Sequence, residues 1–397
     1  MLCDTSTFQE LVQTDNRCVE LVNQIADGAN GVWLWVFLVV RDLLRDISTG
    51  ETYNTLEARL QSLPRELNRY FTRIMERIDP FFRTDTARIL LIMVGSAGPL
   101  PLYALSFLRD ELVAERYAVQ LQVKPHATDT ISKSCADLRL QLHARCGDLL
   151  VVRTDDFYDA FLQHSADFLN RTVRGFLRDN HHTALHLQAP QGFCSERTLL
   201  RMHLALLKSY PMADFRQSIS GLFTIVDEIL YYAYQLEQTG DPLPQFELLD
   251  ELDKPMCIHA KGERVHWTNG RSPPPDTGLV RWMERGCCSY LVLAIQMGLR
   301  HYVEFAVSRD PATMSKKGRP LLDYALWPTG VTHNTLPYSR GQDISDVYAD
   351  LVSFLLSKGA DPNQPIHIYG GQTPWELFVL FASQNHTDPG IQTNIFY

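Results

Sequence analysis

Long apolar runs are scarce in this sequence of 397 residues, and their scarcity argues against a membrane span. The run at 31–40 has about half of the roughly 20 residues that a helix needs to cross a bilayer. Residues 89–108 are numerous enough, but the glycines and prolines in their middle favour two helices joined by a tight turn. The N-terminus has neither the basic nor the apolar segment of a secretory signal. We therefore expect no membrane span.

Cysteines and clusters of basic residues are also sparse. The eight cysteines have irregular spacing, which indicates the reduced thiols of a cytoplasmic protein and no disulfide framework. Lysine and arginine number 37 against 46 acidic residues, so the net charge is −9, and no basic cluster is available to contact a phosphate backbone. The composition therefore disfavours nucleic acid as a partner.

Motifs that carry catalysis or bind nucleotides are absent as well. The sequence has no G-x-x-x-x-G-K-[ST], whose backbone amides and lysine hold phosphates. It also lacks H-E-x-x-H, G-x-S-x-G and C-x-x-C. We therefore expect a chain that is not an enzyme and has no catalytic residue and no cofactor.

Residues that can bind metals occur in two places, in neither case with a recognised spacing. His182 and His186 would share a helix face, as zinc ligands can, yet no carboxylate or cysteine is placed to complete that set. The second group consists of Cys257, His259, His266, Cys287 and Cys288. We predict a solvated histidine face at the first place, core thiols at Cys287 and Cys288, and no metal; a zinc site at either place is the alternative.

Helical periodicity is what the sequence has in abundance. In the first part of the chain, apolar residues recur every three or four positions and predict a train of helices. These helices are expected over 18–28, 32–47, 56–63, 64–78 and 84–94. The second of them is apolar nearly all round at its start, so we expect Trp33, Trp35 and Leu43 to be buried.

The pattern changes after residue 132. A helix there ends at Gly147, and residues 149–153 and 166–169 predict a strand and a returning strand, although short apolar runs alone do not separate strand from helix. Residues 172–178 are expected to be helical again. Helices followed by one small β-hairpin predict a winged-helix domain, in which the hairpin packs on the helical core.

Repeat-like segments lie near the end of the sequence. An apolar segment at 351–356 is followed by GADPN at 359–363 and by GQTPWEL at 371–377, an order that resembles an ankyrin repeat. Thr373 should cap the next helix, with Pro374 at its first position. The alternative is a helical domain without repeats that has one such turn.

Two weaker copies of this pattern precede it, at 290–298 and 318–325. Ala294 and Ala325 hold equivalent positions 31 residues apart, close to the ankyrin period of about 33 residues. An insertion is expected around 328–343. We expect one continuous core lined by Leu291, Ile295, Leu351, Leu355, Trp375 and Phe378.

Five further segments occur in a recognisable order. They are GVWLWV with LVVRDLL at 31–44, LEARL with LP at 56–64, PL with LSF at 99–107, the helix and its end at 138–150, and FLNRTVRGFL at 168–177. In this order they resemble the region that follows the NACHT nucleotide-binding core of fungal NOD-like receptors. In such receptors the region forms a helical lid and a winged helix, which help to hold the nucleotide-bound resting state.

Two positions depart from the family's pattern. The resemblance places Asn170 where the family has a histidine thought to approach the ADP phosphate, and Gly175 where it has an aspartate. An amide can donate a hydrogen bond to a phosphate but supplies no positive charge. We therefore expect Asn170 to cap the helix that starts near Arg171 and predict no cofactor-binding residue.

The resemblance and the patterns together imply a mainly α fold with a small β-hairpin. The expected domains are a helical lid at 1–98 following a missing NACHT core, a winged-helix-like domain at 99–180, a helical connector at 181–267, a linker at 268–278 and degenerate ankyrin-like repeats at 279–397. The linker holds three consecutive prolines, so it should be extended and exposed.

Two functions follow from this organisation. The first is a non-catalytic protein–protein interaction and regulatory module of a NACHT/ankyrin signalling protein, of the fungal non-self recognition or heterokaryon incompatibility type. Its partners would be other proteins, including a NACHT-core chain or a second copy. The alternative is a subunit that completes a nucleotide-dependent switch whose NTPase core is on another chain. The missing phosphate-binding motif favours the first, and the acidic balance disfavours DNA binding through the winged helix.

Overall fold

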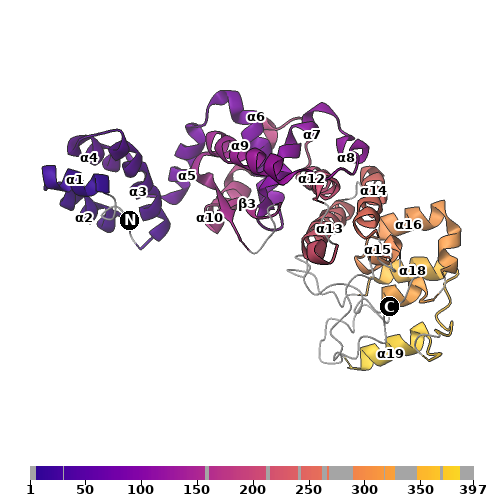
Figure 1. The fold of residues 1–397 in the computed structure, drawn as a ribbon. Helices are drawn as coiled ribbons and strands as arrows, with labels where there is room; N and C mark the ends of the chain where they lie inside the picture. The colour runs from indigo at the N-terminus through magenta and orange to yellow at the C-terminus, as the bar shows by residue number, and fades with distance from the viewer. Residues whose placement is uncertain are drawn as a thin grey trace. The chain divides into compact units, whose positions relative to one another are not determined.

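The computed structural model describes residues 6–29, 31–156, 161–211, 215–239, 243–261, 266–267, 289–316, 318–326, 347–366 and 370–384 of the chain. It is mainly helical with one small antiparallel sheet, which confirms the predicted fold class (Figure 1). Within these ranges, no helix is both long and apolar enough to span a bilayer. The chain divides into two compact units. The first takes in Met1–Val94, Leu140–Val151 and Phe168–Gln191, and the second takes in Gly95–Arg139, Val152–Asp167 and Gly192–Tyr397.

The first unit is a succession of short helices. In chain order they are α1 (Ser6–Thr14), α2 (Cys18–Gly28), α3 (Trp33–Ser48), α4 (Tyr53–Ser62), α5 (Leu67–Glu76), α6 (Arg83–Gly95), α10 (Arg171–Phe176) and α11 (His182–Gln188). α3 packs against α1, α2 and α4. Asp79 ends the α5 region as predicted, because its carboxylate accepts a hydrogen bond from the backbone N–H of Phe81 in the turn that Pro80 begins.

The two tryptophans at the start of α3 differ in burial. Trp35 is 3% exposed, and its indole Nε1 donates a hydrogen bond to the carbonyl oxygen of Pro64 at 2.7 Å. Leu43 is fully buried, as predicted. Trp33, in contrast, is 68% exposed, so the prediction that it is buried is wrong. Trp33 is the first residue of α3, and the buried face of the helix begins two positions later, at Trp35.

A three-stranded sheet lies where the sequence predicted a hairpin. β1 (Leu100–Pro101), β2 (Leu150–Thr154) and β3 (His164–Phe168) are arranged in the order β1-β3-β2. β2 and β3 are the predicted hairpin. β1 was not predicted, because its prolines indicated a turn; it pairs with β3, with Leu100 opposite Ala166. Pro101 is tolerated because β1 is an edge strand, where a missing N–H leaves no ladder bond unmade.

In the second unit, the helices before the predicted linker include a central one, α12. They are α7 (Asp110–Val113), α8 (Tyr117–Gln120), α9 (Thr128–Cys146), α12 (Ser195–Ser209), α13 (Phe215–Gln238) and α14 (Leu243–His259), and the last turns of α9 belong to the first unit. Helices α8, α13 and α14 pack on α12, whose residues from Thr198 to Ser209 are all buried. An all-round buried helix of this kind is the centre of a core.

The helices after residue 289 stack on one another. They are α15 (Tyr290–Gln296), α16 (Arg300–Arg309), α17 (Leu321–Leu326), α18 (Ala349–Ser357) and α19 (Pro374–Gln384). α15 packs against α16 and α17, α17 packs against α18 and α19, and α16 packs against α18. The predicted core is confirmed at four positions, since the following side chains are buried: Ile295, Leu351, Leu355 and Phe378.

The predicted core is wrong at two positions. Leu291 is only half-buried, and Trp375 is 50% exposed. Leu377 and Phe378 form the buried face of α19. Because successive helical residues are about 100° apart, Trp375 lies about 200° from Leu377 but only about 60° from Phe378, so it is at the edge of the buried face. Its ring contacts that of Phe378, with centroids 5.8 Å apart, and its other side is exposed.

The turn between α18 and α19 has the predicted local geometry. Gly359 has a φ of +92°, a conformation that favours glycine. The Thr373 hydroxyl accepts a hydrogen bond from the backbone N–H of Glu376, and the Glu376 carboxylate accepts one from the backbone N–H of Thr373. This reciprocal pair is a capping box, with Pro374 at the first helical position. The predicted linker at 268–278, the insertion at 328–343, Cys287 and Cys288 lie outside the described residues.

Candidate functional site

Asn170 caps α10, as expected from the sequence. Its side-chain Oδ1 accepts hydrogen bonds from the backbone N–H and from the hydroxyl of Thr172, both at 3.0 Å. Its backbone is extended, with φ −153° and ψ 154°, which is typical of the residue before a helix. The carboxamide oxygen therefore has a structural task at the first turn of α10.

We expect Asn170→Ala to lower the free energy of unfolding by about 1 kcal/mol, because the first turn of α10 loses its cap. Asn170→Asp keeps an acceptor oxygen and should retain nearly all of the stability. Urea unfolding followed by circular dichroism measures both variants. An Asn170→Ala protein with the wild-type midpoint would show that the cap contributes nothing.

His182 and His186 of the first unit are not part of a group of three metal-competent side chains among the described residues. The rings of His182 and His186 lie 4.5 Å apart on α11, and both side chains are exposed. Among the described residues, three metal-competent side chains come together in only one group, formed by Asp253, Cys257 and His266. That group contains two of the five residues in the second sequence-predicted set.

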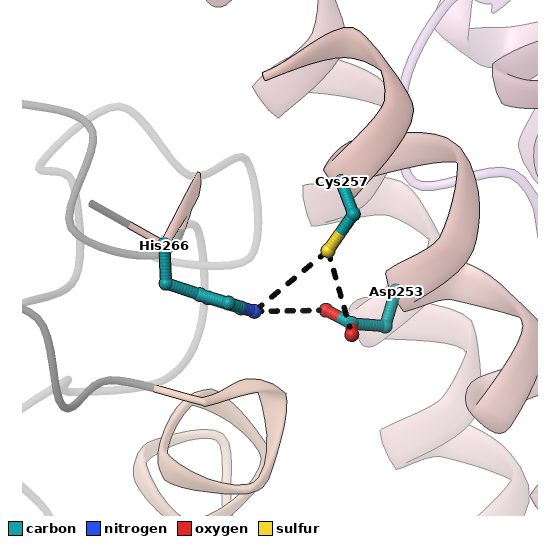
Figure 2. Close-up of side chains that lie close together, drawn as sticks. All are labelled: Asp253, Cys257 and His266. Carbon is teal, nitrogen blue, oxygen red and sulfur yellow. Dashed lines mark hydrogen bonds and ion pairs between the residues drawn. The ribbon is translucent and has the colours of Figure 1, made fainter. Parts of the chain in front are cut away.

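The Asp253–Cys257–His266 cluster is shown in Figure 2. Asp253 and Cys257 are four residues apart on α14 and therefore share a face of the helix. The Cys257 thiol donates a hydrogen bond to Asp253 Oδ2 at 3.6 Å, and Cys257 Sγ lies 3.9 Å from His266 Nε2. His266 Nε2 lies 3.3 Å from Asp253 Oδ1. Three different ligand types thus converge on one small volume.

Trp267, a buried residue, holds the Asp253 carboxylate in place through a hydrogen bond. It is 1% exposed, and its indole Nε1 donates a hydrogen bond to Asp253 Oδ1 at 2.6 Å. Its ring packs near those of Phe223 and Tyr290, with centroids 5.9 and 6.4 Å away. A buried ring with a single donor, held between two helices, leaves little freedom to the neighbouring His266.

His259, the remaining described member of the predicted set, lies elsewhere. It is 9% exposed, and its Nε2 is 3.4 Å from the carbonyl oxygen of Leu207. Burial lowers the pKa of His259, so the imidazole is neutral. It packs α14 on α12 and contributes nothing to the cluster.

The electrostatics of the cluster argue against nucleophilic catalysis. Burial and the neighbouring Asp253 carboxylate raise the pKa of the Cys257 thiol to about 11, so it is protonated at neutral pH. Burial alone would raise the pKa of Asp253, but hydrogen bonds from His266 and Trp267 outweigh it and hold that pKa below its ordinary value.

The geometry leads to the same conclusion. In a catalytic triad, one histidine nitrogen faces the nucleophile and the other faces the carboxylate. Here His266 Nε2 makes both contacts. Convergence of a sulfur, a nitrogen and an oxygen on a common point is instead the arrangement of a ligand set.

A cavity of about 490 Å³ adjoins the cluster and shares Asp253 with it. Its walls include Asp250, Tyr290, Tyr302 and Arg309. The Tyr302 hydroxyl donates to Asp250 at 2.9 Å, and Arg309 pairs with the same carboxylate. Tyr290 is 6% exposed and has a raised pKa because of burial, and its hydroxyl has no hydrogen-bond partner among the described residues. Paired charges and a neutral phenol suit binding better than proton transfer.

Buried charges elsewhere in the second unit hold helices together. The ammonium group of Lys208, 1% exposed, donates to the carbonyl oxygens of Ala118 and Val119 and pairs with Glu251 at 3.0 Å. Burial lowers the pKa of Lys208 although Glu251 opposes this shift. The contacts join α12 to α8 and α14, which is a structural task.

Sequence reasoning missed Asp253 and Trp267. The D-x-x-x-C spacing of Asp253 and Cys257 was a usable signal, because on a helix it places a carboxylate and a thiol on one face. The approach of His266 depends on the path of the chain after α14, which no local pattern encodes.

Comparison with known proteins yields one family. The model of a domain of unknown function, DUF7791, matches residues 77–214. This match covers α6 to α12 with the small sheet, contains Asn170, and ends before the Asp253–Cys257–His266 cluster. No curated protein and no solved structure matches the chain.

Proposed function

We propose that this chain is a non-catalytic protein–protein interaction and regulatory module of a NACHT/ankyrin signalling protein that works in the cytoplasm. The observation that carries the proposal is the stack formed by α15 to α19. The first helix of each predicted repeat packs on the first helix of the next, as α15 does on α17 and α17 does on α19. The second helices pack in the same way, α16 on α18. In repeat proteins, stacking of this kind creates an extended surface that binds partners.

The stack is joined to the helices before it. Glu237 of α13 is 5% exposed and accepts hydrogen bonds from the backbone N–H groups of His301 and Tyr302, both at 3.0 Å. These N–H groups lie in the first turn of α16, where the helix itself provides no acceptor. A buried carboxylate on one helix therefore caps another, which gives a partner-binding stack a fixed support.

The DUF7791 match supports the NACHT part of the proposal. That domain is found in fungal NACHT-type proteins. The match covers much of the stretch whose segments resemble the lid and winged helix of such receptors. Since the chain has no phosphate-binding motif of its own, a protein with a NACHT core is the partner that we propose.

Binding and hydrolysis measured together test the proposal. A purified NACHT-core protein should bind the immobilised full chain, and its ATPase rate should stay unchanged. Trp375→Lys, on the exposed side of α19, should weaken this binding at least about tenfold, an amount equal to 1.4 kcal/mol. The matched control is Phe81→Lys, which alters a residue that is 84% exposed in the first unit.

Other outcomes would change the proposal. A NACHT-core protein that hydrolyses ATP only when this chain is present would support the alternative, a subunit that completes a nucleotide-dependent switch. Equal binding by wild type and Trp375→Lys would show that the outer side of α19 has no part in recognition.

The chain by itself should bind neither ATP nor ADP. A phosphate chain needs a cradle of backbone amides and a lysine, and the sequence contains no such motif. Isothermal titration with magnesium-ATP is expected to give no binding heat beyond dilution. A micromolar dissociation constant for magnesium-ATP would contradict this prediction and the proposal that the chain is non-catalytic.

A further inference from the structure

We propose that Asp253, Cys257 and His266 form a binding site for one zinc ion. Asp253 Oδ1 lies 3.3 Å from His266 Nε2, Asp253 Oδ2 lies 3.6 Å from Cys257 Sγ, and Cys257 Sγ lies 3.9 Å from His266 Nε2. One ligand atom from each side chain lies within 4.8 Å of the other two. Tetrahedral zinc with bonds of about 2.0–2.3 Å requires separations of roughly 3.3–3.6 Å between its ligand atoms. A rotation of the Asp253 carboxylate together with a small movement of the Cys257 side chain would bring one oxygen, the sulfur and the nitrogen to these separations.

The chemistry of the ligands selects the metal. Magnesium and calcium prefer oxygen ligands, whereas a thiol and an imidazole beside one carboxylate suit zinc. All three side chains reach a common point without any change in the helix, because Asp253 and Cys257 share a face of α14 (Figure 2). Three protein ligands leave one tetrahedral position for water or for a group from a partner.

A supporting contact is already in place. Ligands to zinc are oriented by hydrogen bonds from residues behind them. The indole Nε1 of the buried Trp267 donates to Asp253 Oδ1 at 2.6 Å, while Oδ2 lies on the side of the thiol. Trp267 therefore fixes the carboxylate that would bind the ion and, as the next residue in the chain, also places His266.

Binding releases one proton. The Cys257 thiol gives its proton to solvent as the zinc–sulfur bond forms, and the carboxylate binds through a lone pair. The neutral imidazole binds through Nε2 in the tautomer that carries its proton on Nδ1. Neither oxidation nor reduction is involved. The ion would link α14 to residues 266–267, immediately before the predicted linker, so zinc binding would stabilise the end of the helical connector. This inference does not depend on the proposed partner.

The test is metal binding by the full chain. After removal of metals with a chelator, titration with zinc against a chromophoric competitor should give one ion per chain. Cobalt in place of zinc should produce a thiolate-to-cobalt charge-transfer band that Cys257→Ser abolishes. Cys257→Ser and His266→Ala should each weaken zinc binding more than about 100-fold, and Trp267→Phe, which keeps a ring but removes the donor, by about 10–100-fold.

The controls separate this site from other metal-competent groups. Cys194→Ser, His143→Ala and the double variant His182→Ala/His186→Ala should bind zinc as the wild type does. The melting temperature of the wild type should rise with zinc concentration, while that of Cys257→Ser should not. A chain that binds no zinc, or one whose zinc binding survives Cys257→Ser or disappears in the His182/His186 variant, would overturn the proposal and leave a hydrogen-bonded cluster only.

Discussion

Trp35→Ala is expected to lower the free energy of unfolding by about 3–5 kcal/mol, the usual loss for a large aromatic side chain removed from a packed core. The indole is 3% exposed and donates a hydrogen bond to the carbonyl oxygen of Pro64, so the variant loses packing and leaves that acceptor without its donor. Trp33→Ala is the matched control. Because Trp33 is 68% exposed, its loss should stay within about 0.5 kcal/mol.

Gly28 makes this prediction specific to one contact. A Cβ atom added at Gly28 would lie 2.8 Å from Cη2 of Trp35, closer than real Cβ contacts allow. Gly28→Ala should therefore cost about 1–3 kcal/mol through overpacking in the wild type. In the Trp35→Ala background it should cost much less, because the ring that it meets is gone. Urea unfolding of the four proteins gives this coupling. Equal losses for Trp33→Ala and Trp35→Ala, or additive losses for Gly28→Ala, would contradict the packing.

The error at Trp33 shows what helical periodicity can predict. The spacing of apolar residues placed α2 and α3 within a few residues of their bounds and correctly buried Leu43. It could not separate Trp33 from Trp35, because the start of α3 is apolar on every side and both residues match a buried pattern. The hydrogen bond from Trp35 to Pro64, a residue of a later segment, marks the buried one.

Features that depend on neighbouring residues could be predicted from the sequence more reliably than features that depend on long-range packing. The caps at Asn170 and Thr373 were both predicted, since capping depends on residues within one turn. β1 and the exposure of Trp375 were not, because each depends on which distant segment packs beside it. The same limit applies to the Asp253–Cys257–His266 cluster. The helix spacing of two members could be read from the sequence, whereas the approach of the third depends on the tertiary fold.

A buried ion pair at the N-terminal end of α17 gives the second large effect. Arg319 and Asp323 are both 1% exposed and pair directly, and the Arg319 guanidinium lies 3.9 Å from the centroid of the Tyr324 ring. Removing one partner of a buried pair takes the opposite charge away from the other in a medium of low dielectric constant. Asp323→Ala is therefore expected to cost about 3–5 kcal/mol.

A surface pair in the same stack is the control. Arg300 pairs with Asp350 at 2.9 Å, but the two side chains are 43% and 80% exposed. Water and salt screen such a pair, so Asp350→Ala should leave the unfolding midpoint unchanged. The double variant Arg319→Met/Asp323→Leu replaces the buried pair by apolar groups and should recover most of the stability that Asp323→Ala loses.

Urea unfolding followed by circular dichroism measures all three variants. Because of the position of this ion pair, the stability of Asp323→Ala also reports on the stack formed by α15 to α19. This helix packs against α15, α18 and α19, so it lies at the centre of the stack that carries the proposed function. If Asp323→Ala loosens the stack, it should also weaken binding of a NACHT-core protein, and the double variant should restore that binding together with the stability.

An Asp323→Ala protein as stable as Asp350→Ala would show that Arg319 does not need this partner. A stable double variant that fails to bind would instead show that the ion pair itself takes part in recognition.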